Sequence, residues 1–132
     1  CIYPRESDVH ADANEASLVL QASIDSFHLL FTGDAGEIAE QQMAETGRLD
    51  AVDILKVGHH GSRYATSEAF LQYIKPQYAV ISCGKKNRYG HPHEETLTRL
   101  QAAGAEVYRT DSSGAVILQI RAGKIMLHGY GG

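Results

Sequence analysis

The chain has 132 residues, a formal net charge of −4 and 43% hydrophobic residues. This length suits one domain and the apolar content can fill a core, so we expect neither a disordered chain nor a disulfide-dependent mini-fold. The apolar runs are too short to cross a bilayer, we expect no signal peptide, and the mild acidity argues against a protein that coats nucleic acid.

The first half of the chain predicts a hairpin, a helix and a short strand. Two apolar segments flank a turn at Asp25 and Ser26, which is the pattern of a β-hairpin. Gly47 is a plausible stop for the helix that follows, because glycine ends helices readily. The predicted strands cover residues 17–22, 27–32 and 53–57, and the predicted helix covers residues 37–46.

The second half alternates helices and strands and ends in another hairpin. Ser67 is a candidate N-cap, and residues 78–82 form the apolar run typical of a strand buried on both faces. The predicted helices cover residues 67–74 and a stretch from Pro92 or His93 to 103, and the predicted strands cover residues 78–82, 105–109, 115–120 and 124–127. This order predicts an α/β fold, with a mixed β-sheet and helices on one face.

The two cysteines carry little chemistry. Cys1 and Cys83 allow one pairing and no disulfide framework, and no CxxC motif suggests a thiolate metal site. Cys83 follows an apolar run, so we expect a small buried side chain there. The chain also begins at Cys1 rather than at a methionine, which leads us to expect a piece of something longer.

Three loops that directly follow predicted strands hold most of the chemically active side chains. Residues 32–35 contain Asp34, and residues 58–62 and 84–93 together contain four of the seven histidines. Ligands and catalytic groups in such sheets gather where strands end. We therefore expect any functional site at this edge of the sheet.

Asp34 has two interpretations. It stands three residues before Glu37, which is the spacing of a capping box at the start of a helix. Alternatively, its carboxylate is a ligand for one or two divalent cations, because each oxygen can bind one ion.

The pair His59 and His60 also has two interpretations. It is either a surface pair in a glycine-rich turn, or one ligand beside one group that faces the substrate. Neighbouring side chains in an extended segment point apart, so we expect only one of the two to bind a given metal ion.

The third loop is basic. Lys85, Lys86 and Arg88 alternate with Asn87 and Tyr89, which is either a solvated loop or a contact surface for phosphates, with a tyrosine able to stack on a base. His91 follows in the same loop, just before a predicted helix N-terminus whose amides favour an anion, and Pro92 is expected in the first turn of that helix.

Taken in order, these segments resemble the metallo-β-lactamase superfamily, and more narrowly the C-terminal domain of ComEC-type competence proteins, which handle DNA during uptake. The resemblance covers essentially the whole chain. It rests on NEASLVL (residues 14–20), LFTGDA (residues 30–35), LKVGHHGS (residues 55–62), NRYGHPH (residues 87–93), VYRTD (residues 107–111) and Gly114-Ala115.

The resemblance implies a four-layer αββα sandwich whose site, between two sheets, holds two zinc or manganese ions. Asp34 would bridge the metals, His60 would bind the second one, and His59 would lie close to the substrate. The implied chemistry is hydrolysis of a DNA phosphodiester by metal-activated water. The implied catalytic residues are His59 and His91, and His91 would also face phosphate. The implied phosphate-binding residues are Ser62, Lys85, Lys86, Asn87 and Arg88.

One motif of the resembled family is missing. HxHxDH, which belongs to the N-terminal half of its fold, does not occur in the chain. We therefore expect residues 1–132 to form a single fragment, the C-terminal half of such a domain, with two metal ligands and an exposed apolar sheet face. Such a fragment should be inactive alone, should bind metal weakly at best, and should pack against the missing N-terminal half or form a homodimer through that face.

Two other functions stay open from the sequence. One is an esterase or small-molecule hydrolase of the same fold, and the other is a DNA-binding module without catalysis. The resemblance further implies a soluble domain of a bacterial cytoplasmic-membrane protein, on the extracytoplasmic side.

Overall fold

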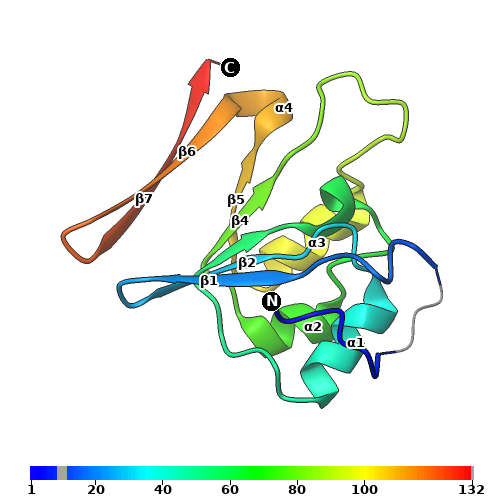
Figure 1. Cartoon of the computed structure of the whole chain (residues 1–132). Coiled ribbons are helices and arrows are strands. Elements are labelled where there is room, and N and C mark those ends of the chain that lie inside the picture. The colour runs from blue at the N-terminus through cyan, green and yellow to red at the C-terminus, as the bar shows by residue number, and fades with distance from the viewer. Residues whose placement is uncertain (9–11, 132) are drawn as a thin grey trace.

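The computed structural model describes residues 1–8 and 12–131 and has the expected α/β fold. A five-stranded sheet has the order β1-β2-β3-β4-β5, and a separate two-stranded sheet pairs β6 with β7 (Figure 1). The strands are β1 (Leu20–Ile24), β2 (Phe27–Phe31), β3 (Ile54–Lys56), β4 (Tyr78–Ile81), β5 (Glu106–Arg109), β6 (Gly114–Arg121) and β7 (Lys124–Gly131). The helices are α1 (Glu37–Glu45), α2 (Glu68–Ile74), α3 (Glu94–Ala102), the short α4 (Thr110–Ser113) and a 3₁₀ turn, η1 (Gly58–Gly61).

The five-stranded sheet is mixed, as predicted. β1 and β2 form an antiparallel hairpin around the turn at Asp25 and Ser26, and β2, β3, β4 and β5 run parallel to one another. Parallel strands end at the same edge of a sheet. The loops after β2, β3 and β4 therefore leave from one edge, which is where the sequence places the candidate site.

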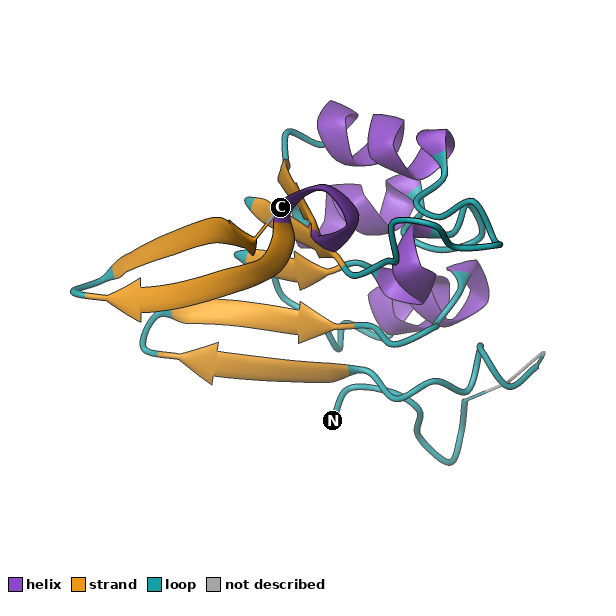
Figure 2. Cartoon of the chain, turned by 90° about the horizontal axis from the view of Figure 1, so that it is seen from above, coloured by secondary structure: helices purple, strands orange, loops and turns teal. Residues whose placement is uncertain are grey.

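Helices α1, α2 and α3 cover one face of the sheet (Figure 2). Leu30, Leu55 and Ala79 stand in register on neighbouring strands and face this layer. They are completely buried and pack in one cluster with Phe70 and Leu100 of the helices. Apolar burial of this kind is the main source of stability for the fold.

The other face of the sheet is apolar and partly open. Leu20, Ile24 and Phe31 are 41%, 46% and 43% exposed, although each is a large hydrophobic residue. The β6–β7 hairpin stands on the side away from the three large helices (Figure 1) and leaves a cavity of about 150 Å³ against the sheet. That cavity is lined by Leu29, Leu30, Phe31, Ile54, Lys56, Val80, Val116 and Leu118.

The structure differs from the sequence prediction at several element ends. The first strand begins at Leu20 rather than at residue 17, because Val19 instead forms an isolated bridge with Tyr3. Helix α3 begins at Glu94 with His93 as its N-cap. Pro92 therefore precedes the helix, whereas the sequence predicted it in the first turn. No helix in the described ranges 1–8 and 12–131 is long and apolar enough to span a membrane.

The last hairpin is longer than predicted and does not extend the main sheet. The unpredicted turn α4 and Gly114, with φ 69°, redirect the chain after β5. β6 therefore lies against β5 without pairing with it.

Two buried carboxylates hold the starts of the helices. Glu15 accepts a hydrogen bond from the Ala39 amide in the first turn of α1, whose N-cap Gly36 has no side chain to do so. Glu40 accepts hydrogen bonds from the amides of Thr66 and Ser67 at the start of α2, where Ser67 is the predicted N-cap. Burial raises the pKa of Glu40 from 4.5 to about 7, despite these hydrogen bonds.

Glu40 should make the chain less stable as the pH rises from 4.5 to above 7. An acid whose pKa rises on folding holds its proton more tightly in the folded state, so this contribution is complete below 4.5 and is lost as the pH passes through about 7. We expect Glu40→Gln to remove this loss, which is on the order of 3 kcal/mol at most. Urea unfolding at a series of pH values measures it.

Glu45→Gln is the matched control, because Glu45 lies exposed at the end of the same helix. Its pH profile should follow that of the native chain. If Glu40→Gln also kept the native profile, the assignment of the pH dependence to Glu40 would be wrong.

Candidate functional site

The three predicted loops come together at the carboxyl edge of the sheet. The His59 amide donates to the carbonyl of Gly33 at 2.9 Å, which joins the loop after β2 to the turn after β3. The His93 amide donates to the carbonyl of Gly61 at 2.9 Å, which joins that turn to the loop after β4. These two bonds join residues that are 26 and 32 positions apart in sequence.

The turn η1 forces two histidines into an uncommon backbone conformation. His59 and His60 have φ values of 46° and 56°, in the left-handed region that costs a residue with a Cβ roughly 1–2 kcal/mol. Gly61, at φ 85°, leaves no room for a side chain, because a Cβ there would lie 2.6 Å from the Cβ of Pro92. Backbone strain of this kind is concentrated at functional sites.

His60 is oriented like a metal-binding histidine. Its Nδ1 lies 2.7 Å from the carbonyl oxygen of Ser82, so Nδ1 carries the proton and donates it. In the neutral ring the other nitrogen, Nε2, then carries the lone pair that can bind a metal ion, and the side chain is exposed. A backbone carbonyl that fixes the ring in this way is a usual partner of metal-binding histidines.

His91 is the centre of an aromatic cluster. Its ring centroid lies 5.7 Å from that of His59, 6.5 Å from His60, 4.8 Å from His93 and 5.7 Å from Tyr89. Burial lowers the pKa of His91, and the three neighbouring histidines lower it further, whereas Asp34 acts in the opposite direction. The ring is therefore held in its neutral form, which can accept a proton or a hydrogen bond.

Asp34 does not cap a helix, so that interpretation is wrong. The N-cap of α1 is Gly36, and Glu15 supplies the capping carboxylate instead. The Asp34 amide donates to Ser17 Oγ at 3.2 Å, and no hydrogen bond or ion pair engages the Asp34 carboxylate within the described part of the chain. That carboxylate is half-buried and is electrostatically coupled to Lys56 and His91.

Lys56 is a site residue that the sequence analysis missed. It stands at the end of β3 on the open face, among apolar side chains, and its Nζ donates to the Val57 carbonyl at 3.1 Å. Burial lowers its pKa, and Asp34 and Cys83 act in the opposite direction. A lysine inside the otherwise apolar segment 54–57 was the available clue, because a cation is rarely placed there without a partner.

The segment directly after the turn is bonded to the helix layer by two further residues that the sequence did not single out. Thr96 Oγ1 donates to the carbonyl of Ser62 at 2.9 Å, and the guanidinium of Arg99 donates to the carbonyls of Ala65 and Thr66. Ser62 itself is 2% exposed, and its hydroxyl accepts from the Tyr64 amide. These contacts make Ser62 a structural residue here, and its contact with phosphate stays a prediction.

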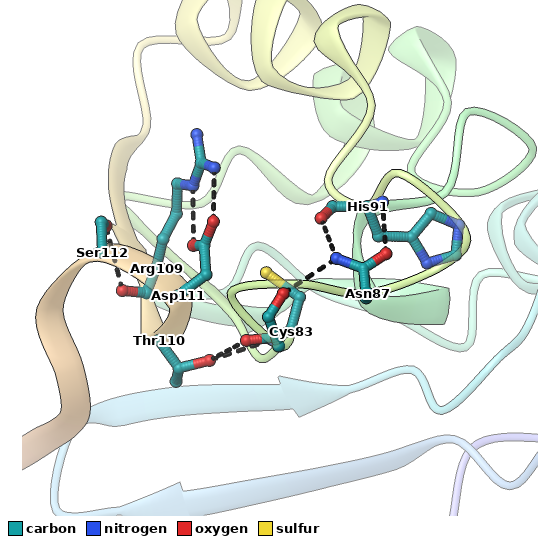
Figure 3. A network of polar contacts seen from close by, with 8 residues as sticks. Cys83, Asn87, His91, Arg109, Thr110, Asp111 and Ser112 are labelled. Carbon is teal, nitrogen blue, oxygen red and sulfur yellow. Dashed lines mark hydrogen bonds and ion pairs between the residues drawn. The ribbon is translucent and has the colours of Figure 1, made fainter.

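The basic loop is closed by Asn87 (Figure 3). Its side-chain amide donates to the carbonyls of Gly84 and His91 and accepts from the His91 amide. Asn87 therefore positions His91, and direct contact with phosphate stays a prediction for it. The cations Lys85, Lys86 and Arg88 of the same loop are exposed.

Cys83 follows the end of β4 and lies on the side of Asn87 away from His91 (Figure 3). The Thr110 hydroxyl accepts from its amide and donates to its carbonyl, each at 2.9 Å. Burial raises the pKa of the Cys83 thiol, so it stays protonated at neutral pH. Cys1 and Cys83 are both free thiols, and Cys83 packs partly against the core.

The candidate metal ligands are of the right chemical type for a divalent cation, but there are too few of them. Asp34 and His60 offer a carboxylate and an imidazole nitrogen, which zinc and manganese both accept. Across residues 1–8 and 12–131, however, no group of three or more histidine, cysteine, aspartate or glutamate side chains is placed to hold one ion. A complete site thus needs donors that this set does not supply.

Comparison with known proteins relates the chain to proteins several times longer. It is 42% identical over 106 residues to ComE operon protein 3 of Bacillus subtilis (strain 168), a match that covers 80% of the chain and 14% of that protein. It is 39% identical over 107 residues to competence protein ComA of Neisseria gonorrhoeae, covering 80% and 15%. It is 39% identical over 103 residues to recombination protein 2 of Haemophilus influenzae (strain ATCC 51907 / DSM 11121 / KW20 / Rd), covering 78% and 13%.

These similarities support a relationship to competence proteins. The chain spans about a seventh of the length of the curated relatives it matches. No family model matches the chain, so the resemblance to the metallo-β-lactamase superfamily stays a prediction.

Gly61→Ala should loosen the contact between the turn and the basic loop. The new Cβ adds a clash with Pro92 to the strain of a positive φ, so we expect a loss of about 2–4 kcal/mol in the free energy of unfolding. Gly104→Ala is the matched control, because Gly104 has φ 79° and a Cβ added to it would meet no atom within 4 Å. It should lose only about 1–2 kcal/mol. Equal losses in chemical denaturation would show that the contact with Pro92 is unimportant.

Proposed function

We propose that the chain is part of a metal-dependent nuclease in a protein of DNA uptake. The competence-related relatives support the biological setting. The convergence of His59, His60 and His91 with a free carboxylate and a basic loop, all at one edge of the sheet, supports the chemistry. This convergence is the observation that carries the proposal.

Each group has a role that follows from its placement. Asp34 and His60 would hold a divalent ion, which supplies an activated water and neutralises charge on a phosphodiester. His91, kept neutral by burial and by its neighbours, would accept a proton or a hydrogen bond at the reacting centre. His59 would face the substrate, and Lys85 and Lys86 would attract the phosphate backbone.

We propose that the remaining metal ligands come from another part of a longer protein. The relatives contain about six times as much chain, and the open apolar face of the sheet borders the same site through Phe31 and Lys56. A second sheet packed on this face would bury Leu20, Ile24 and Phe31 and bring further donors to Asp34. A homodimer through the same face remains the alternative arrangement for the isolated chain.

A DNA-binding role without catalysis is the second candidate. It is favoured by the small number of metal donors that the described residues bring together. The basic loop and the aromatic cluster do not require a metal ion to bind a polyanion. A small-molecule esterase is less well supported, because a loop with three exposed cations suits a polyanion better.

Asp34→Asn should abolish nuclease activity. With Mn²⁺ or Zn²⁺, we expect the protein that carries this chain to cleave DNA and the isolated 132 residues to cleave it weakly or not at all. Removing an outer partner of a metal ligand already costs about 10–100-fold, so loss of the carboxylate should lower kcat/KM by at least about 100-fold. Cleavage of a labelled oligonucleotide measures this effect.

The matched control is Asp25→Asn, in the β1–β2 turn at the far end of the strands, which should keep native activity. Turnover by the isolated chain equal to that of the longer protein would refute the need for further ligands. Native activity in Asp34→Asn would refute the metal role of Asp34.

Lys85→Ala and Lys86→Ala should each weaken DNA binding and reduce its dependence on salt. Log K falls as log salt concentration rises, and each phosphate contact that is lost makes this slope less steep by about 0.7–0.9. Lys124→Ala, at the exposed first residue of β7, is the control and should leave the slope unchanged. Fluorescence anisotropy at several salt concentrations tests this, and an unchanged slope in both loop variants would exclude the loop from the DNA interface.

A further inference from the structure

A cavity of about 210 Å³ opens beside the histidine cluster, at the end of β4. Pockets for drug-sized ligands usually enclose roughly 300–1,000 Å³, so this one suits a single ring system rather than a whole nucleotide. Its lining consists of His60, Cys83, Gly84, Asn87, Tyr89 and His91. Figure 3 shows three of these residues, Cys83, Asn87 and His91, in the loop that forms one wall.

Two near-parallel rings in the lining form a stacking surface. The rings of Tyr89 and His91 have an interplanar angle of 25°, with their centroids 5.7 Å apart. Tyr89 is 61% exposed, so its ring is accessible to a ligand from solvent. The guanidinium carbon of Arg88 lies 4.8 Å from the centre of the Tyr89 ring, so a cation lies beside the stacking surface.

Two polar side chains of the lining, Asn87 and His60, bond to other groups of the protein. The amide of Asn87 bonds to Gly84 and His91, and Nδ1 of His60 bonds to Ser82. Apart from Nε2 of His60 and the ring nitrogens of His91, the cavity therefore offers mainly π-faces rather than a pattern of donors and acceptors. Stacking of this kind tolerates every base, whereas sequence readout needs free polar groups at the base edges.

We propose that this cavity holds one unpaired nucleobase of single-stranded DNA, stacked on Tyr89 and His91. The inference rests on the proposed function, because it places the neighbouring phosphate of the same strand toward His60 and Asp34. A base in a duplex is paired and stacked on its neighbours, so it would first have to leave the helix to enter. The preferred substrate is then single-stranded DNA of any sequence.

Binding of three DNA probes tests the proposal without any cleavage. The probes are a mixed-sequence single strand, the same strand with several abasic sites, and a blunt duplex, each measured by fluorescence anisotropy in EDTA with the 132-residue chain. We expect the intact single strand to bind more tightly than the abasic strand or the duplex. Tyr89→Ala should weaken binding of the intact strand about 5- to 150-fold and leave the abasic strand unchanged.

Two further variants guard against a general loss of structure. Tyr89→Phe keeps the ring and should keep native binding, although it loses the 2.6 Å bond from Arg88 to the phenol oxygen. Tyr73→Ala removes a partly exposed tyrosine from α2, in the helix layer, and should change binding of none of the probes.

The outcomes separate this inference from the proposed function. Equal binding of intact and abasic strands, or tighter binding of the duplex, would overturn the base site even if metal-dependent cleavage is found. A preference for intact single strands that depends on Tyr89 would support the base site even if no metal ion yields cleavage, in which case the nuclease proposal fails and the base site stands.

Discussion

The conformation of the Gly58–Gly61 turn is the constraint on which the site depends. Two successive histidines adopt left-handed backbone angles there, at a cost of roughly 1–2 kcal/mol each. Hydrogen bonds that join the turn to Gly33 and His93, and its C-cap residue Ser62 to Thr96, offset this strain. The backbone that carries the two rings is thus bonded to both neighbouring loops and, through Ser62, to the helix layer.

The sheet explains why these contacts can form. Parallel β2, β3 and β4 deliver three loops to one edge, and the buried row Leu30, Leu55 and Ala79 sets the register of the strands beneath them. A slip of one residue would turn Lys56 toward the helices and Leu55 toward the open face. The apolar core thus determines where the polar groups of the site emerge.

Most of the fold could be predicted from local patterns, and most of the distant contacts could not. Apolar runs predict the strands and helices, Ser67 predicts the start of α2 and Gly47 predicts the end of α1. These signals depend on residues close in sequence, and the structure confirms them. The bond from Arg99 to Thr66 spans 33 residues and the bond from Glu15 to Ala39 spans 24, so no local spacing reveals them. The same limit explains the error at Asp34, where the expected cap was supplied from elsewhere in the chain.

The proposed division of the site between two parts of a longer protein has an energetic consequence. If Asp34 and His60 supply only part of a metal site, the ion binds tightly only when the open sheet face is covered by the part that brings the other ligands. By linkage, metal binding then stabilises that packing by the same free energy with which the packing strengthens metal binding. The exposed Leu20, Ile24 and Phe31 would contribute apolar burial to this interface, so one packing event would complete both the core and the metal centre.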